Sequence, residues 1–230
     1  MKNSRKAFTT LAAACVFLGV ALMPGCVSTT MQQVRDADTG IESNEAIAVL
    51  GRKFLSRDET ESGFLDCVAE KSSSGANSLK VIPHEEFVDH LFPWFEPRTA
   101  PLDIVDMKNL VKNETIAQRL DDKDVRYIVW IEGTTERAEQ GGTLNCAVAT
   151  GGVPACFGFL SWEAESNYEA IVWDIRRSVT AGKVSSEARG MSFVPAIIIP
   201  IPFIARTQAH ACTHMSKQLK QFIAGPAEVE

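Results

Sequence analysis

The sequence lacks the short motifs that mark the common catalytic and nucleotide-binding sites. It has no Gly-x-Ser-x-Gly segment around a nucleophilic serine, no Gly-x-Gly-x-x-Gly turn and no Walker A loop. It also has no Cys-x-x-Cys pair, the spacing typical of structural zinc sites. Basic residues are fewer than acidic ones, 23 against 29, and the net charge of −6 argues against a general nucleic-acid binder. We therefore predict no catalytic, cofactor-binding or metal-binding residues and no nucleic-acid partner.

The few histidines do not change this prediction. His210 and His214 lie one helical turn apart, a spacing that can hold a metal ion. The glutamate of a His-Glu-x-x-His motif is absent, however, and no third ligand is evident. Solvent-facing histidines near the start of a helix are the simpler interpretation. His84 and His90, six residues apart, carry even less information.

The N-terminus has the features of an exported lipoprotein. Three basic residues precede an apolar stretch over residues 7–23, which is short for a membrane-spanning helix of about 20 residues. It ends in Leu22-Met23-Pro24-Gly25-Cys26, which resembles the lipobox of bacterial lipoproteins, where the cysteine is acylated and becomes the new N-terminus. Gly25 matches the expected small residue, whereas Met23 and Pro24 depart from the usual pattern. We predict a signal peptide over residues 1–25 and a lipid on Cys26; the alternative is a simply cleaved secreted protein.

The resemblance to lipoproteins also predicts where the protein resides. Residues 1–25 hold three basic and no acidic residues, so the mature chain has 20 basic and 29 acidic residues and a net charge of −9. Such a body lacks the polybasic patch that would attract it to an anionic membrane surface. More than one acyl chain on the cysteine suffices for stable anchoring. In similar lipoproteins an Asp directly after the cysteine retains the protein at the inner membrane. This sequence has Val27 at that position, so the resemblance implies that the protein is anchored in the outer membrane and faces the periplasm.

The remaining cysteines agree with export to an oxidising compartment. Once Cys15 is removed and Cys26 is acylated, four are left: Cys67, Cys146, Cys156 and Cys212. Four cysteines allow three pairings. We favour Cys146–Cys156, which flank a loop rich in glycine, and Cys67–Cys212, which join two predicted helices. Buried free thiols are the alternative.

The mature chain predicts one α/β domain over residues 46–225. A flexible tether over residues 26–45 precedes it and a short tail over residues 226–230 follows. Strands are predicted over residues 47–50, 79–82, 125–132, 168–178 and 184–189, and helices over residues 60–72, 83–92, 113–120 and 209–223. Helices between the early strands favour parallel pairing, and a hairpin turn at Ala181-Gly182 favours antiparallel pairing later. The expected fold is a mixed five-stranded sheet flanked by helices.

This order of elements resembles a superfamily of periplasmic lipoproteins. It comprises a lipobox, an Ile-Ala-Val-Leu strand, a helix, a Leu-Lys-Val-Ile strand that opens into a helix, a Val-Arg-Tyr-Ile-Val-Trp-Ile-Glu-Gly strand, a long hairpin and a C-terminal helix. The superfamily includes the curli-secretion lipoproteins, the lipoprotein activators of penicillin-binding proteins and the N-terminal domain of TolB. The resemblance covers about residues 46–224 and implies a non-enzymatic protein that binds partners, forms pores or regulates envelope machinery. No contact residue is transferred by it.

An uncharged apolar segment over residues 193–204 is the most unusual feature. Its three prolines argue against a regular central strand or a helix. It is either a buried crossover on the core or an exposed ridge that contacts a partner or the membrane. In the second case the contact residues are Ile197, Ile198, Ile199, Ile201 and Phe203.

The function predicted from these features is that of a membrane-anchored periplasmic lipoprotein. It would act as a non-enzymatic binding or assembly factor of the cell envelope, with another envelope protein as its partner. An oligomeric pore or secretion component is the alternative, and a periplasmic enzyme is a weaker one.

Overall fold

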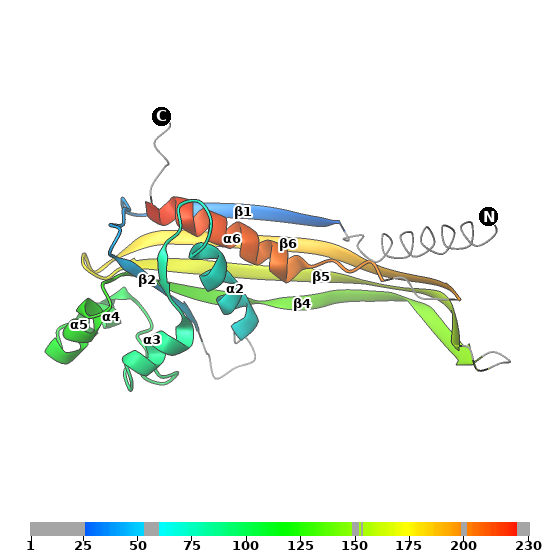
Figure 1. Ribbon diagram of the computed structural model, residues 1–230, viewed down its shortest axis with the longest axis horizontal. Coiled ribbons are helices and arrows are strands. Elements are labelled where there is room, and N and C mark those ends of the chain that lie inside the picture. The colour runs from blue at the N-terminus through cyan, green and yellow to red at the C-terminus, as the bar shows by residue number, and fades with distance from the viewer. Residues whose placement is uncertain (1–25, 53–59, 149–151, 153, 199–201, 225–230) are drawn as a thin grey trace, which may run out of the picture. The chain divides into compact units, whose positions relative to one another are not determined.

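The computed structural model describes residues 26–52, 60–148, 152, 154–198 and 202–224 (Figure 1). The side chains of residues 138, 139, 154, 197 and 198 are outside this description. The predicted signal peptide and C-terminal tail also lie outside the described residues. Among the described helices, none combines the length and the apolarity needed to cross a bilayer.

The described chain forms a mixed α/β fold, as predicted. Its strands are β1 (Val27–Arg35), β2 (Ala46–Gly51), β3 (Lys80–Ile82), β4 (Val125–Val148), β5 (Pro154–Asp174) and β6 (Val179–Ile198). Its helices are α2 (Ser62–Ser72), α3 (His84–His90), α4 (Ile104–Leu110), α5 (Glu114–Asp121) and α6 (Thr207–Ala224). The strands form one six-stranded sheet in the order β1-β6-β5-β4-β2-β3.

The chain divides into two compact units, whereas the sequence predicted one domain. Unit 1 contains residues 136–165 and 189–207 and the N-terminal residues up to 28. Unit 2 contains residues 29–135 and 166–188 and the chain from residue 208 onward. Strands β4, β5 and β6 are 24, 21 and 20 residues long and contribute to both units. The sequence predicted only the parts of these strands that lie in unit 2.

The parallel part of the sheet lies in unit 2. β2 pairs in parallel with β3 and with β4, and Ala48 faces Ile82 on one side and Ile128 on the other. All six residues of β2 are buried, which explains why its sequence is apolar throughout rather than alternating. The prediction of parallel early strands is confirmed.

Helices cover both faces of this sheet. Ala48, Leu50, Ile128 and Trp130 face a core to which α3, α4 and α5 contribute Phe87, Leu91, Met107, Ile116 and Leu120. Residues one position along each strand point to the opposite face. On that face α2 stacks Phe64 on Tyr168 of β5, and α6 packs on β6, where Ser186 donates a hydrogen bond to the Ala211 carbonyl.

Strand β1 occupies residues that the sequence predicted to be a tether. The strand pairs with β6 at the edge of the sheet and raises the number of strands from the predicted five to six. Its exposed residues are mostly polar, so the segment lacks the apolar alternation that would reveal a strand. The prediction of a flexible tether at residues 27–35 is therefore wrong.

The hairpin between β5 and β6 turns earlier than the predicted Ala181-Gly182. Residues 175–178 form the turn, and Ala181 and Gly182 lie inside β6. The glycine is needed for a different reason: a Cβ atom on Gly182, whose φ is +149°, would lie 2.2 Å from the carbonyl oxygen of Val34 in β1. Glycine is therefore required here because the backbone of β1, which the sequence did not predict as a strand, passes close to it, and not because the chain turns.

Both predicted disulfides are confirmed. Cys67 of α2 bonds to Cys212 of α6, 145 residues away, and Cys146 of β4 bonds to Cys156 of β5, 10 residues away. The first bond lies in unit 2 and the second in unit 1. Figure 1 shows α2 and α6 side by side, as the first bond requires.

The two disulfides are expected to differ in their effect on stability. Replacing Cys67 and Cys212 together by alanine should lower the free energy of unfolding by about 4–5 kcal/mol, because a long loop constrains the unfolded chain most. The matched pair Cys146→Ala with Cys156→Ala should cost about 3 kcal/mol, since its loop is short. Urea unfolding of both double variants checks the order, and a larger loss for the short loop would contradict it.

Candidate functional site

A cavity of about 820 Å³ opens in unit 2 where the parallel strands end. Its wall includes Gly51 and Arg52 at the end of β2, His84 just after β3, and Trp130 of β4. Ligands of open α/β sheets bind outside the carboxyl ends of parallel strands, and this volume lies within the range of small-ligand and peptide pockets. The position and size make the cavity the candidate binding site.

Trp130 forms the floor of the cavity on one side. Its side chain is 4% exposed and lies between Phe95, whose ring centroid is 6.2 Å away, and Trp173, at 5.8 Å. The indole Nε1 is buried and has no hydrogen-bond acceptor within the described residues. A buried donor without a partner costs free energy. Because this nitrogen is shielded from solvent, the ring of Trp130, and not its Nε1, is the part that lines the cavity.

Arg52 is held beside this tryptophan. Its Nε lies 2.6 Å from the Glu132 carboxylate, and its guanidinium lies 5.0 Å from the Trp130 ring centroid and 5.6 Å from that of Trp173. Two aromatic faces and one carboxylate fix the charge in place. Arg52 is therefore a positioned cation rather than a mobile surface residue.

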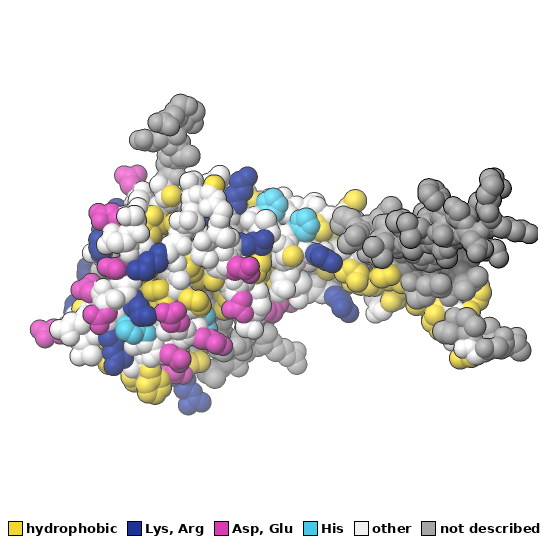
Figure 2. Space-filling model, viewed as in Figure 1, with side chains coloured by type: hydrophobic (Ala, Val, Ile, Leu, Met, Phe, Trp, Pro, Cys, Tyr) yellow, Lys and Arg dark blue, Asp and Glu magenta, His cyan; other side chains and the backbone are white. Residues whose placement is uncertain are grey.

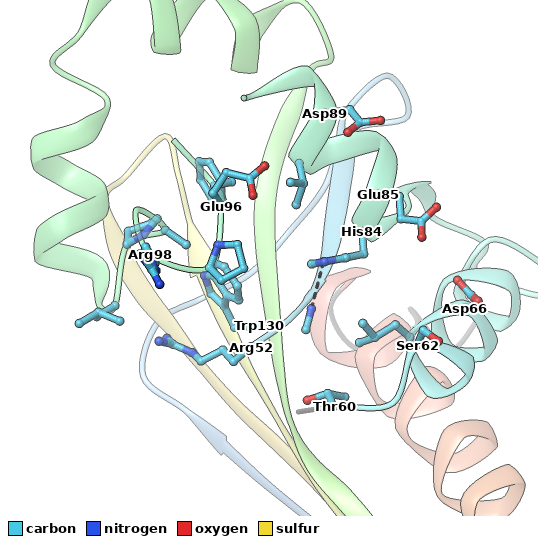
Figure 3. A pocket seen from close by; sticks show the side chains of 18 residues that line it. Arg52, Thr60, Ser62, Asp66, His84, Glu85, Asp89, Glu96, Arg98 and Trp130 are labelled. Carbon is cyan, nitrogen blue, oxygen red and sulfur yellow. Dashed lines mark hydrogen bonds between the residues drawn. The ribbon is translucent and has the colours of Figure 1, made fainter. Parts of the chain in front are cut away.

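His84 is oriented by the end of β2. Its Nδ1 accepts a hydrogen bond from the Gly51 amide at 3.4 Å (Figure 3). Gly51 itself is closely packed, because a Cβ atom there would lie 2.5 Å from a methyl group of Leu65. The chain between Arg52 and Thr60, residues 53–59, lies outside the described residues.

The two sides of the cavity differ in charge. Figure 3 shows Arg52 and Arg98 on the side of Trp130, and Asp66 of α2 and Glu85 of α3 on the opposite side. Asp89 and Glu96 also line the cavity. None of the described Lys or Arg side chains pairs with these four carboxylates. The acidic side suits a ligand that carries positive charge.

A hydrogen-bond network fixes the start of α2 near this cavity. The Tyr168 hydroxyl donates to Glu61 at 2.8 Å, and Thr135 lies 2.8 Å from the same hydroxyl. The Thr135 amide donates to the other Glu61 oxygen at 2.9 Å, and Gln208 donates to Tyr168 at 3.3 Å. Burial raises the pKa of Tyr168 well above its ordinary value, and the Glu61 carboxylate raises it further. Thr60, predicted to begin the helix, is instead buried and donates to the Ile131 carbonyl.

Other residues singled out in the sequence lie outside this cavity. His210 and His214 are exposed on α6, and the described residues contain no group of three metal-ligating side chains. His90 Nε2 lies 2.8 Å from the Arg119 carbonyl. Cys26 is exposed and is not part of either disulfide.

The apolar segment 193–204 is only partly described. Ile199 and Ile201 lie outside the described residues, as do the side chains of Ile197 and Ile198. Phe203 is half-buried, and its backbone pairs with that of Phe193 in an antiparallel bridge. β6 runs through Pro195 to Ile198, so this part of the segment is extended rather than helical. A strand tolerates proline where the ladder needs no N–H at that position.

The sequence did not identify the cavity, although one signal was present. The predicted parallel strands end just before Gly51-Arg52 and Pro83-His84, which is where such folds place their ligands. Trp130 was assigned to a strand without a role. Phe95, which also lines the cavity, is buried against Phe87 with 4.9 Å between the ring centroids.

Comparison with known proteins does not assign the chain to a family. No protein-family model and no curated protein matches the chain. Among solved structures, two dodecamers of PelC from Paraburkholderia phytofirmans are similar to it, each with 10% sequence identity over 86% of this chain. They have TM-scores of 0.40 and 0.39, with 100% and 99% of the PelC chain covered, and the first is a single-residue variant. Neither likeness is close enough to transfer an assembly or a function.

Stability at high pH is expected to depend on Tyr168. The unfolded hydroxyl ionises near pH 10, whereas the folded one keeps its proton to higher pH. The stability that it contributes is therefore complete below pH 10 and is lost as the pH rises through the folded pKa. Tyr168→Phe should lose about 1–3 kcal/mol at neutral pH, since Glu61 and Thr135 lose a partner, and should then decline less steeply above pH 10. Urea unfolding at several pH values tests this, and parallel curves for the two proteins would contradict it.

Proposed function

We propose that this protein is an outer-membrane lipoprotein, anchored through Cys26, that binds a segment of another envelope protein without catalysing a reaction. The observation that carries the anchor is the state of the cysteines. Two disulfides join Cys67 to Cys212 and Cys146 to Cys156. Such bonds are typical of an oxidising compartment outside the cytosol. Cys26, at the end of the lipobox-like segment, is exposed and left over. Its sulfur is therefore accessible to acylation.

Acylation of Cys26 can be tested by growth with an alkyne-bearing palmitate analogue. The unaltered protein and Cys15→Ser should take up the label, because Cys15 lies inside the predicted leader. Cys26→Ser should take up none. Detection is by coupling a fluorophore to the alkyne after gel electrophoresis. A label that persists in Cys26→Ser would overturn the anchor.

The binding role rests on the cavity beside Trp130. One side offers the guanidinium groups of Arg52 and Arg98, whose N–H donors fit backbone carbonyls of an extended peptide. The other side offers the carboxylates of Asp66 and Glu85, which fit basic side chains. Apolar Leu65 and Val88 line the space between the charges. We propose that the occupant is an extended, basic segment of a partner protein.

Site-specific photo-crosslinking in intact cells tests this occupant. A crosslinking amino acid at Leu102, which is 66% exposed and lines the cavity, should yield a discrete adduct. The same amino acid at Val105, 60% exposed but not part of the cavity, is the matched control and should yield none. Trp130→Phe replaces the indole that lines the cavity by a smaller ring, and should weaken the Leu102 adduct several-fold. Equal adducts at both positions, or no effect of Trp130→Phe, would contradict binding in this cavity.

A further inference from the structure

In unit 1 large apolar side chains are exposed and small ones are buried, which is the reverse of the usual arrangement. Six of its large apolar side chains are exposed: Val148, Phe157, Phe159, Met191, Phe193 and Ile204. Its buried apolar side chains are small: Cys156, Ala164, Ala196 and Ala205. A water-soluble protein buries large apolar residues first, so this unit presents the surface of a protein in contact with an apolar medium.

The same unit contains long stretches without charge. Residues 140–162 and 190–205 contain no Asp, Glu, Lys or Arg. Charged residues stand directly at the ends of these stretches: Glu139 and Glu163 at the first, and Arg189 and Arg206 at the second. Figure 2 shows charged side chains over the helices, whereas the β5 and β6 surface of unit 1 is yellow or white where grey atoms leave it visible. Interspersed charge normally keeps a surface soluble, and this surface has none.

The exposed apolar side chains are held in fixed positions. The disulfide Cys146–Cys156 joins β4 to β5, and the rings of Phe159 and Phe193 lie 5.9 Å apart between their centroids, joining β5 to β6. Phe157 and Phe159 are two residues apart on β5, and both are exposed. The apolar surface is therefore a feature of the folded strands.

Aromatic and basic side chains lie at the boundary of the uncharged stretches. The guanidinium of Arg137 lies 5.6 Å from the Trp162 ring centroid, and Arg189 forms an ion pair with Glu165. Trp and Arg side chains each have an apolar body and a polar end, and they are typical of the interface between lipid and water. An apolar region bordered by such residues matches the depth profile of a bilayer better than the contact of two identical protein surfaces.

The proposed anchor leaves from this unit. The Cys26 carbonyl and the Val27 side chain pack against Gly190 of β6, and β1 begins immediately after Cys26. Ser28 donates to the Arg189 carbonyl at 3.5 Å. With no tether between the acylated residue and the strand, a lipid on Cys26 would hold unit 1 at the membrane surface.

We infer that the exposed apolar surface of unit 1, formed by Val148, Phe157, Phe159, Met191, Phe193 and Ile204, docks into the lipid surface that receives the Cys26 acyl chains. This inference rests on the proposed function for its location. The surface adds a second, reversible membrane contact to the anchor, and it fixes the orientation of the protein on the bilayer. The occupant is the acyl and headgroup region of a phospholipid layer.

Vesicle flotation of the unacylated mature chain tests the docking surface. The Cys26→Ser protein, exported behind a conventional cleavable leader so that its disulfides form, is mixed with vesicles of phosphatidylethanolamine and phosphatidylglycerol. A fraction should float with the vesicles. Phe157→Asp and Met191→Asp, 56% and 64% exposed in the parent, should each lower the partition coefficient about tenfold, because a charge replaces apolar surface.

A matched control separates docking from general loss of hydrophobicity. Phe92 is 60% exposed but lies in unit 2, so Phe92→Asp should float as the parent does. All variants should keep the melting temperature of the parent, since none removes a buried side chain. Equal loss in all three variants, or no flotation of the parent, would overturn the docking surface. A dimer in solution that Phe157→Asp dissociates, without flotation, would replace the lipid by a second copy of the chain.

Fluorescence gives a second readout that needs no substitution in the docking surface. Of the four tryptophans, only Trp162 lies in unit 1. Brominated lipids should quench its emission, and Trp162→Phe should remove the quenched component. Quenching that persists in Trp162→Phe would contradict docking through this unit. The acyl label on Cys26 is scored separately, so a labelled protein whose unacylated form does not float rejects the docking surface and leaves the proposed anchor intact.

Discussion

The hydroxyl of Tyr168 is the contact on which unit 2 depends. It lies where β4, β5, α2 and α6 meet, and it joins Glu61 before α2, Thr135 of β4 and Gln208 of α6. Its ring stacks on Phe64 with centroids 3.5 Å apart. A few residues away, the disulfide between Cys67 and Cys212 links the same two helices covalently. Both helices are thereby fixed on one face of the sheet, and the start of α2 is held where it forms a wall of the cavity.

Much of this framework follows from local patterns in the sequence. The apolar run of β2, the capping Asn113 before α5 and the amphipathic α6 were predicted because each depends on residues close in the chain. The disulfides were predicted because export and an even number of cysteines left few pairings. α4 was missed, although Asp103 accepts hydrogen bonds from the amides of Val105 and Asp106 as a helix cap.

The errors have a common physical origin in contacts between distant residues. The sequence of β1 does not alternate between apolar and polar residues. The segment is a strand because it pairs with the otherwise free edge of β6. Gly182 appeared to mark a turn, but it accommodates the backbone of that same strand. The cavity likewise combines residues that are far apart in the sequence: Arg52 after β2, His84 at the start of α3 and Trp130 of β4. Only the rule that ligands bind at the carboxyl ends of parallel strands could have indicated the cavity.

The same three strands meet two different environments along their length. In unit 2 the apolar residues of β4 and β5, such as Ile128 and Trp173, are buried beneath helices. In unit 1 the strands contain Phe157, Phe159 and Phe193 and leave them exposed, while the small side chains of Cys156, Ala164 and Ala196 are buried. Selection for solubility alone would place charges on such strands, as it does at Glu169 and Lys183 in unit 2. Unit 1 also contains Cys26, the last residue of the segment that resembles a lipobox. Our proposal that lipid, rather than a helix, covers these strands accounts for both observations.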